Sequence, residues 1–231
     1  MEMRKLLTTF LLLGVIVSYG QKKSGEFAIY PRIGINYSKI NNSNIEIYDP
    51  NGFGIGSLKS NFKFGIVAGA ELQYQISSSY IASIGLLYSL QGTSYKDISS
   101  KTTPDKWIIN GNKTILHFLN LPLLAIINFG FVGYSRFHFA VGLEPGWKIA
   151  CQNQFTDIPN PLYSVPTKGR IIQEYKAMDL SIPIGIGIDF STLCIDLRYN
   201  IGIINTNNLN KSHSKSQRIE LIIGYRIAIV K

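Results

Sequence analysis

Hydrophobic and polar residues alternate almost without error in the stretch Asp179–Phe190, which reads DLSIPIGIGIDF. Every even position carries a large apolar side chain, and the odd positions carry Asp, Ser, Pro or Gly. A two-residue period predicts a β-strand with one apolar face and one face of small or charged residues. Pro183 stands in the middle of this strand, although proline cannot donate a backbone hydrogen bond to a neighbouring strand.

The same alternation recurs in eight segments, each of which we expect to form a strand. They are approximately Glu26–Ser38, Phe62–Gln75, Tyr80–Tyr95, Lys113–Phe129, Arg136–Cys151, Tyr175–Phe190, Leu193–Asn205 and Gln217–Ile229. The second, fourth and sixth connections are short, and the others are long and polar. An even number of strands, with short turns at one end and long loops at the other, is typical of bacterial outer-membrane barrels.

The two faces of these strands indicate which one is outward. In the seventh segment one face is apolar and carries Leu193, Ile195, Leu197, Tyr199, Ile201 and Ile203. The opposite face carries Cys194, Asp196, Arg198, Asn200 and Gly202. The lumen of an eight-stranded barrel is narrow, so small residues and a few opposed charges belong inside it. The apolar face then contacts lipid. The predicted fold class is all-β: an eight-stranded antiparallel up-and-down transmembrane β-barrel in the cell outer membrane.

Outward aromatic residues gather at two heights. Near the short turns they are Phe27, Tyr74, Tyr80, Phe129, Phe137 and Phe190, and nearer the long loops they are Tyr37, Phe62, Tyr88, Trp147 and Tyr199. Two such rings are the interfacial girdles of a membrane barrel.

The N-terminus differs in kind from the rest of the chain. Arg4 and Lys5 precede an apolar run, Leu6–Val17, and the small residues Ser18 and Gly20 follow it. This pattern predicts a signal peptide over residues 1–20 and a mature barrel domain over residues 21–231. The alternative is an uncleaved anchor helix, for which the apolar run is short. Export through this signal predicts periplasmic termini and short turns, with the long loops extracellular.

The two cysteines are predicted to lie at opposite ends of the barrel. Cys194 follows the last short turn, whereas Cys151 lies at the loop end of its strand. About 14 residues of strand at ~3.3 Å each separate the two heights. Because a disulfide needs Cα atoms within roughly 7 Å, we expect two free thiols.

Two prolines occupy equivalent places in two strands. Asn120-Leu121-Pro122-Leu123 resembles Ser181-Ile182-Pro183-Ile184, and both prolines fall on the lumen face. A closed barrel has no free edge for a proline, so we expect a bulge or an omitted ladder bond at each.

These two strands, together with FGIVAG at Phe64–Gly69, GLEPG at Gly142–Gly146 and LRYNIG at Leu197–Gly202, resemble the PorT-like outer-membrane β-barrel family of Bacteroidetes. The resemblance runs from about Glu26 to the C-terminus. It implies a small barrel, like OmpA or OmpX in size, of mostly unassigned role. The family's namesake participates in type IX protein secretion, so a secretion role would be implied by analogy of fold. Unlike many outer-membrane barrels, this chain does not end on an aromatic residue.

Charged residues on the lumen face are the candidate site. They are Arg32, Glu71, Glu144, Lys148, Asp179, Asp196, Arg198, Glu220 and Arg226. Predicted heights pair Asp196 with Arg226 and Lys148 with Asp179. One interpretation is an ion-pair network that fills the narrow lumen, since buried charges require partners. The other is an ion path or gate, for which eight strands leave little room.

The histidines suggest little catalytic chemistry. A lipid-modifying hydrolase or acyltransferase needs a nucleophile with a base, and the sequence has no Gly-x-Ser-x-Gly elbow. The one catalytic arrangement to consider is His117, which faces outward near the long loops, together with a loop serine or aspartate. His138 faces the lumen, and His213 lies in the last long loop. Paired His or Cys spacing typical of a metal site is also missing from the sequence. We therefore expect no enzyme, catalytic residue, cofactor or metal.

The formal net charge of +9 changes the expected partners. The long-loop cations are Lys96, Lys101, Lys106, Lys168, Arg170, Lys211 and Lys215. They could contact lipopolysaccharide phosphates in addition to outer-membrane lipid, or simply form a solvated basic surface. Nucleic acid is not expected as a partner in this compartment. The favoured function is a structural or interaction role; the alternatives are a component of type IX secretion with secretion-machinery partners, a small porin-like pore, or a lipid-modifying enzyme.

Overall fold

The computed structural model describes residues 25–41, 45–48, 54–96, 98–99, 108–109, 113–132, 135–154, 175–206 and 214–229. The predicted signal peptide lies outside this part of the chain. So do His213 and the loop residues Lys101, Lys106, Lys168, Arg170 and Lys211.

Long strands make up almost all of the described chain. The barrel strands are β1 (Phe27–Ile40), β5 (Lys63–Gln75), β6 (Tyr80–Tyr95), β9 (Lys113–Asn120), β10 (Leu123–Val132), β11 (Ser135–Gln154), β12 (Met178–Phe190), β13 (Leu193–Gly202), β14 (Ser216–Tyr225) and β15 (Ile227–Ile229). Short strands near the long loops are β2 (Ile45–Tyr48), β3 (Gly54–Leu58), β4 (Ser60–Asn61), β7 (Ile98–Ser99) and β8 (Ile108–Ile109).

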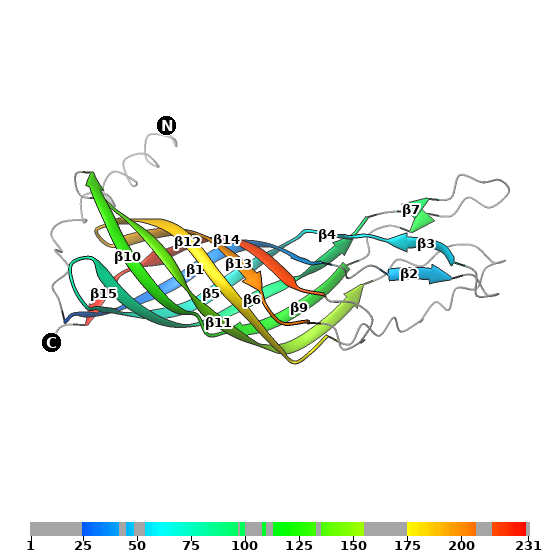
Figure 1. Ribbon diagram of the computed structural model, residues 1–231, viewed down its shortest axis with the longest axis horizontal. Coiled ribbons are helices and arrows are strands. Elements are labelled where there is room, and N and C mark those ends of the chain that lie inside the picture. Colours follow the sequence, from blue (N-terminus) through cyan, green and yellow to red (C-terminus); the bar gives the residue numbers. More distant parts are fainter. Residues whose placement is uncertain are drawn as a thin grey trace, which may run out of the picture.

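The sheet closes on itself. Its order is β10-β11-β12-β13-β14-β1-β5-β6, and β6 pairs in turn with β9 and β10 (Figure 1). All of these pairings are antiparallel. Since β9 with β10 and β14 with β15 each form one interrupted strand, the described residues build a closed eight-stranded antiparallel barrel. The predicted fold class is confirmed.

Apolar side chains cover the outside of this barrel. Ile33 and Phe64 are 67% and 71% exposed, whereas Glu71 and Arg198 inside are 1% and 2% exposed. Period-2 alternation produces this arrangement, because successive side chains of a strand point to opposite faces of the sheet. An apolar outer wall around a polar interior is the arrangement of a membrane barrel. Within the described residues no helix is long and apolar enough to cross a membrane, a finding that does not bear on β-barrels.

Outward aromatic rings contact one another across neighbouring strands at both ends of the barrel. Near the short turns, the ring centroids of Phe27 and Tyr74 lie 4.7 Å apart. Near the loops, Tyr37 stacks on Phe62 at 4.7 Å and contacts Phe64 at 4.6 Å. These contacts join adjacent strands at the heights where the sequence predicts aromatic girdles.

Both lumen prolines lie where strand pairing is interrupted, as predicted. Pro122 separates β9 from β10, and its carbonyl accepts a hydrogen bond from the Gly85 amide at 2.9 Å. Pro183 remains inside β12, but the β11–β12 pairing has a gap where Gly142 faces it. The barrel therefore tolerates proline by omitting ladder bonds while keeping the sheet closed.

The prediction of two free thiols is also confirmed: Cys151 is exposed and Cys194 is buried. Cys194 follows the turn between β12 and β13, and Cys151 lies near the loop end of β11.

Candidate functional site: the charged lumen

Four charged side chains form a closed network in the barrel interior. They come from β1 (Arg32), β5 (Glu71) and β13 (Asp196 and Arg198). Glu71 accepts hydrogen bonds from Arg32 Nε at 3.0 Å and from Arg198 Nη1 at 2.6 Å. Asp196 Oδ2 accepts from Arg32 Nη1 at 2.7 Å and from Arg198 Nη2 at 3.1 Å. Two cations and two anions alternate around this central network, so its charges cancel.

A second network lies closer to the loops. Arg218 of β14 donates to Glu220 Oε1 from Nε at 2.6 Å, and from Nη2 to Glu144 Oε1. Asn200 Nδ2 donates to the other Glu220 oxygen at 2.8 Å. All four side chains are at most 2% exposed. Two stacked networks thus occupy successive levels of the interior, as expected of an eight-stranded barrel filled by side chains.

Histidine and carboxylate groups lie below the central network, towards the short turns. His138 Nε2 is 2.6 Å from Asp196 Oδ1, and its Nδ1 is 3.7 Å from Asp189 Oδ1. At the barrel end, Arg226 Nη2 pairs with Glu26 Oε1 at 2.5 Å.

Glycines on the lumen face provide the space for these large side chains. A Cβ on Gly224 would lie 2.5 Å from Arg32 Nη1, and a Cβ on Gly187 would lie 2.3 Å from His138 Nε2. Directly paired positions across strands include Arg32 with Gly224, His138 with Gly187, Arg198 with Gly185, and Glu71 with Gly85. The small residues of the DLSIPIGIGIDF strand therefore have a function in packing: they leave room for charged groups on neighbouring strands.

The structure places the nine predicted lumen residues as follows. Arg32, Glu71, Glu144, Asp179, Asp196, Arg198 and Glu220 are buried, and Lys148 and Arg226 are half-buried near the two ends. The networks bring together six of them: Arg32, Glu71, Asp196 and Arg198 in one, and Glu144 and Glu220 in the other.

The two predicted ion pairs are wrong. Asp196 pairs in register with Ile222, four residues or about 13 Å of strand from Arg226. Arg226 contacts Glu26 instead.

The Lys148–Asp179 prediction fails for the same reason. Gly146, rather than Lys148, is the register partner of Asp179. Lys148 Nζ donates to the Tyr175 carbonyl, and Asp179 accepts from Ser216 Oγ at 2.6 Å.

Sequence reasoning missed Arg218, which anchors the second network. Arg218 has the same parity as Glu220 in β14, so the alternation itself marks it as a lumen residue. Asp189 was missed in the same way, although it shares the lumen face of β12 with Asp179.

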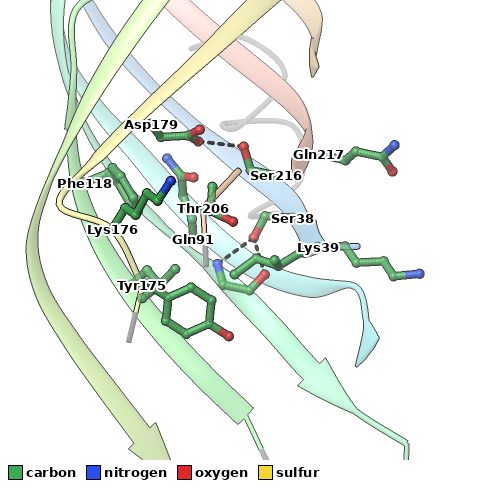
Figure 2. Close-up of a pocket in the computed structure, with 13 residues that line it drawn as sticks. Ser38, Lys39, Gln91, Phe118, Tyr175, Lys176, Asp179, Thr206, Ser216 and Gln217 are labelled. Atoms are coloured by element: carbon green, nitrogen blue, oxygen red, sulfur yellow. Dashed lines mark hydrogen bonds between the residues drawn. The ribbon is translucent and has the colours of Figure 1, made fainter. Parts of the chain in front are cut away.

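A pocket lies at the loop end of the lumen, as Figure 2 shows. It encloses about 330 Å³, part of it open to solvent. Its polar lining includes Ser38, Gln91, Lys176, Asp179, Thr206 and Ser216, and its apolar lining includes Ile40, Leu116, Phe118 and Tyr175. Ser38 Oγ accepts from the Gly92 amide at 3.0 Å, which ties β1 to β6 across this opening.

His117 has a partner on the neighbouring strand. Among the described residues, its Nδ1 lies 2.7 Å from the Tyr88 hydroxyl. The two rings also contact each other, with centroids 6.0 Å apart. This pair resembles the outward aromatic contacts between other neighbouring strands.

Sequence comparison agrees with this architecture. Residues 19–208 match the family described as the outer membrane protein beta-barrel domain. The chain belongs to this family. Membership in the outer membrane protein beta-barrel domain family assigns the chain to the outer membrane as a transmembrane barrel.

Comparison of this family member with solved structures finds outer-membrane proteins at low sequence identity. Neisserial surface protein A is 11% identical, with 87% of this chain and 99% of that chain covered and a TM-score of 0.43. OprG from Pseudomonas aeruginosa is 11% identical, with 89% and 97% covered and a TM-score of 0.42. Ail of Yersinia pestis is 13% identical, with 88% and 99% covered and a TM-score of 0.38. No curated protein sequence matches the chain.

Proposed function

We propose that this outer-membrane barrel is a closed, non-enzymatic scaffold that holds its long loops at the cell surface. Its termini and short turns face the periplasm. The observation that carries this proposal is the interior filled with paired charges. A scaffold needs a rigid, sealed barrel, whereas a pore needs a continuous aqueous path.

The two networks close the middle of the lumen. Arg32, Arg198 and Arg218 are each at most 3% exposed and each contacts two carboxylates. Breaking a buried ion pair by removing one partner typically costs about 3–5 kcal/mol. Opening a path through these levels would disrupt several such contacts at once, so a small pore is the less favoured role.

Lysines at the loop end of the barrel support the orientation and a lipid partner. The rim lysines include Lys39, Lys59, Lys63, Lys96, Lys113, Lys176 and Lys215. Among the described side chains near these lysines, Asp179 is acidic, and it is buried. Lipopolysaccharide phosphates at the outer leaflet are the anions that such a rim would attract. The short-turn end is balanced instead, with Glu26 and Asp189 against Arg136 and Arg226.

Planar-bilayer recording of the reconstituted full chain tests this function. Flotation with vesicles first establishes insertion. A closed scaffold gives no channel steps, and reproducible steps in the wild type would reject it. A Glu71→Ala/Arg198→Ala double variant removes two central side chains without changing net charge, so conductance in that variant serves as the positive control.

A component of type IX secretion is the second candidate. It is supported by the strands around Pro122 and Pro183, which carry the resemblance to PorT-like barrels of Bacteroidetes. The test is the secreted proteome of a clean deletion strain in the native host, with complementation. Specific loss of secreted cargo supports this role, and unchanged secretion rejects it.

A further inference from the structure

Three different metal-binding side chains converge inside the barrel near the short turns. They are His138 of β11, Asp189 of β12 and Cys194 of β13, on three consecutive strands. One ligand atom from each lies within 4.8 Å of the other two. Their exposed fractions are 2%, 7% and 1%, so the group is enclosed by protein.

The hydrogen bonding of His138 directs its second nitrogen into this group. Its Nε2 lies 2.6 Å from Asp196 Oδ1, and Arg32 and Arg198 both donate to the other oxygen of that carboxylate. A carboxylate held by two guanidinium groups accepts hydrogen bonds, so Nε2 carries the proton that is shared with it. In the neutral ring Nδ1 then keeps a lone pair.

The Nδ1 atom is buried and, among the described residues, has no hydrogen-bond partner. It points towards Asp189 Oδ1 at 3.7 Å, which is too long for a hydrogen bond. A lone pair that faces a carboxylate oxygen in a buried site calls for a cation between them. A histidine that donates its other N–H to a carboxylate is also the usual arrangement of a metal-bound imidazole.

We propose that His138 Nδ1, the Asp189 carboxylate and Cys194 Sγ bind a divalent transition-metal ion of the Zn²⁺ class, with water as fourth ligand. Thiolate, imidazole and carboxylate are the three donor types of protein zinc sites. Metal–ligand distances of about 2.0–2.3 Å bring ligand atoms to roughly 3.5 Å from one another. The three side chains therefore move together by about 1 Å on binding.

The charges around this group suit a divalent cation. Arg32, Arg198, Glu71 and Asp196 already cancel in the central network, and Arg226 pairs with Glu26. Binding displaces the Cys194 proton to solvent, since thiolate is the ligand form. The Cys194 thiolate and the Asp189 carboxylate then offer two negative charges to the ion, and Arg136, the register partner of Asp189, lies on the neighbouring strand β11.

A pocket at the short-turn end provides the route of entry. It encloses about 190 Å³, part of it open to solvent, and its lining includes Glu26, Tyr30 and Arg226. Tyr30 packs against Cys194, so movement of this one ring connects the pocket to the metal ligands. Local sequence spacing could not indicate the site, because its ligands come from three strands.

The test uses Co²⁺ as a spectroscopic substitute for Zn²⁺. The untagged full chain is extracted in detergent, treated with chelator and titrated with Co²⁺. We expect one equivalent to bind, with a thiolate-to-cobalt charge-transfer band that added Zn²⁺ abolishes. The two native cysteines supply matched variants: Cys194→Ser should lose the band, whereas Cys151→Ser should keep it.

Asp189→Asn and His138→Gln should each weaken binding at least tenfold, and circular dichroism checks that each variant folds. Independently of any one variant's folding, Zn²⁺ should raise the urea midpoint of the wild type and of Cys151→Ser. Absence of one-equivalent binding in the wild type would overturn the proposal. A band that depends on Cys151 would overturn it equally.

Discussion

Removal of the Glu71 carboxylate should destabilise the barrel strongly. Glu71 is 1% exposed and contacts both Arg32 and Arg198, at distances from 2.6 to 3.1 Å. Glu71→Gln keeps the shape of the side chain but leaves the central network with two guanidinium groups and one carboxylate. One positive charge is then buried without compensation.

The magnitude follows from that uncompensated charge. Removing one partner of a buried ion pair costs about 3–5 kcal/mol, which lowers the folding equilibrium constant by about 10²- to 10⁴-fold. The matched control is Glu26→Gln, which removes the carboxylate of the more exposed pair with Arg226. Pairs in contact with solvent contribute about 0–1 kcal/mol, so this variant should remain close to the wild type.

A double variant separates charge balance from simple loss of contacts. Glu71→Gln/Arg198→Met leaves Arg32 with Asp196 at 2.7 Å, and the remaining charges cancel. It should therefore cost at least about 1 kcal/mol less than the sum of the two single variants. Urea titration in lipid vesicles, followed by tryptophan fluorescence, measures the wild type, both single variants of the cycle, the double variant and Glu26→Gln. A Glu71→Gln cost below about 1 kcal/mol, or exact additivity in the cycle, would refute the reasoning.

Three further predictions concern packing, membrane depth and lipid. Gly224→Ala places a methyl group 2.5 Å from Arg32 Nη1 and should lower the free energy of unfolding by about 1–3 kcal/mol in the same titration. An unchanged free energy of unfolding would show that the Arg32 guanidinium can move to another position without loss. Ile186→Lys, at a 57% exposed position in the middle part of β12, should cost about 2–4 kcal/mol in vesicles, against about 0–1 for Ile203→Lys near the loops. Equal costs would contradict the assigned depth. Changing the exposed rim lysines to glutamine should lower co-purified lipopolysaccharide several-fold, whereas Arg136→Gln at the other end should not; equal retention would argue against the rim as its contact.

The local pattern predicted most of this fold, because the alternation within each strand indicates which of its side chains face inward and which face outward. The fifth segment, predicted as Arg136–Cys151, is β11 at Ser135–Gln154. The interruption at Pro122 followed from proline's missing donor in a sheet without edges. These inferences needed no knowledge of which strands are neighbours.

Partners in the lumen could not be predicted in the same way. Which charges meet depends on the stagger between strands, and a closed barrel shifts each strand relative to the next. Asp196 thus meets Arg32 of β1, which is two strands away from β13 in the sheet, rather than Arg226. By contrast, the alternation within β14 is sufficient to predict that Arg218 faces the lumen. The sequence alone predicts which residues of a strand face the lumen, but it does not predict which lumen residues of different strands lie at the same height.

The sealed lumen is the central claim, and the native cysteines test it most directly. In the folded, chelator-treated barrel, a small water-soluble thiol reagent should modify exposed Cys151 readily. Cys194, 1% exposed beside the central network, should react at least about 10³-fold more slowly than in urea-unfolded chain, because modification requires local opening. Reaction of Cys194 within tenfold of its unfolded rate, while the barrel remains folded, would show a water-filled lumen and contradict the account.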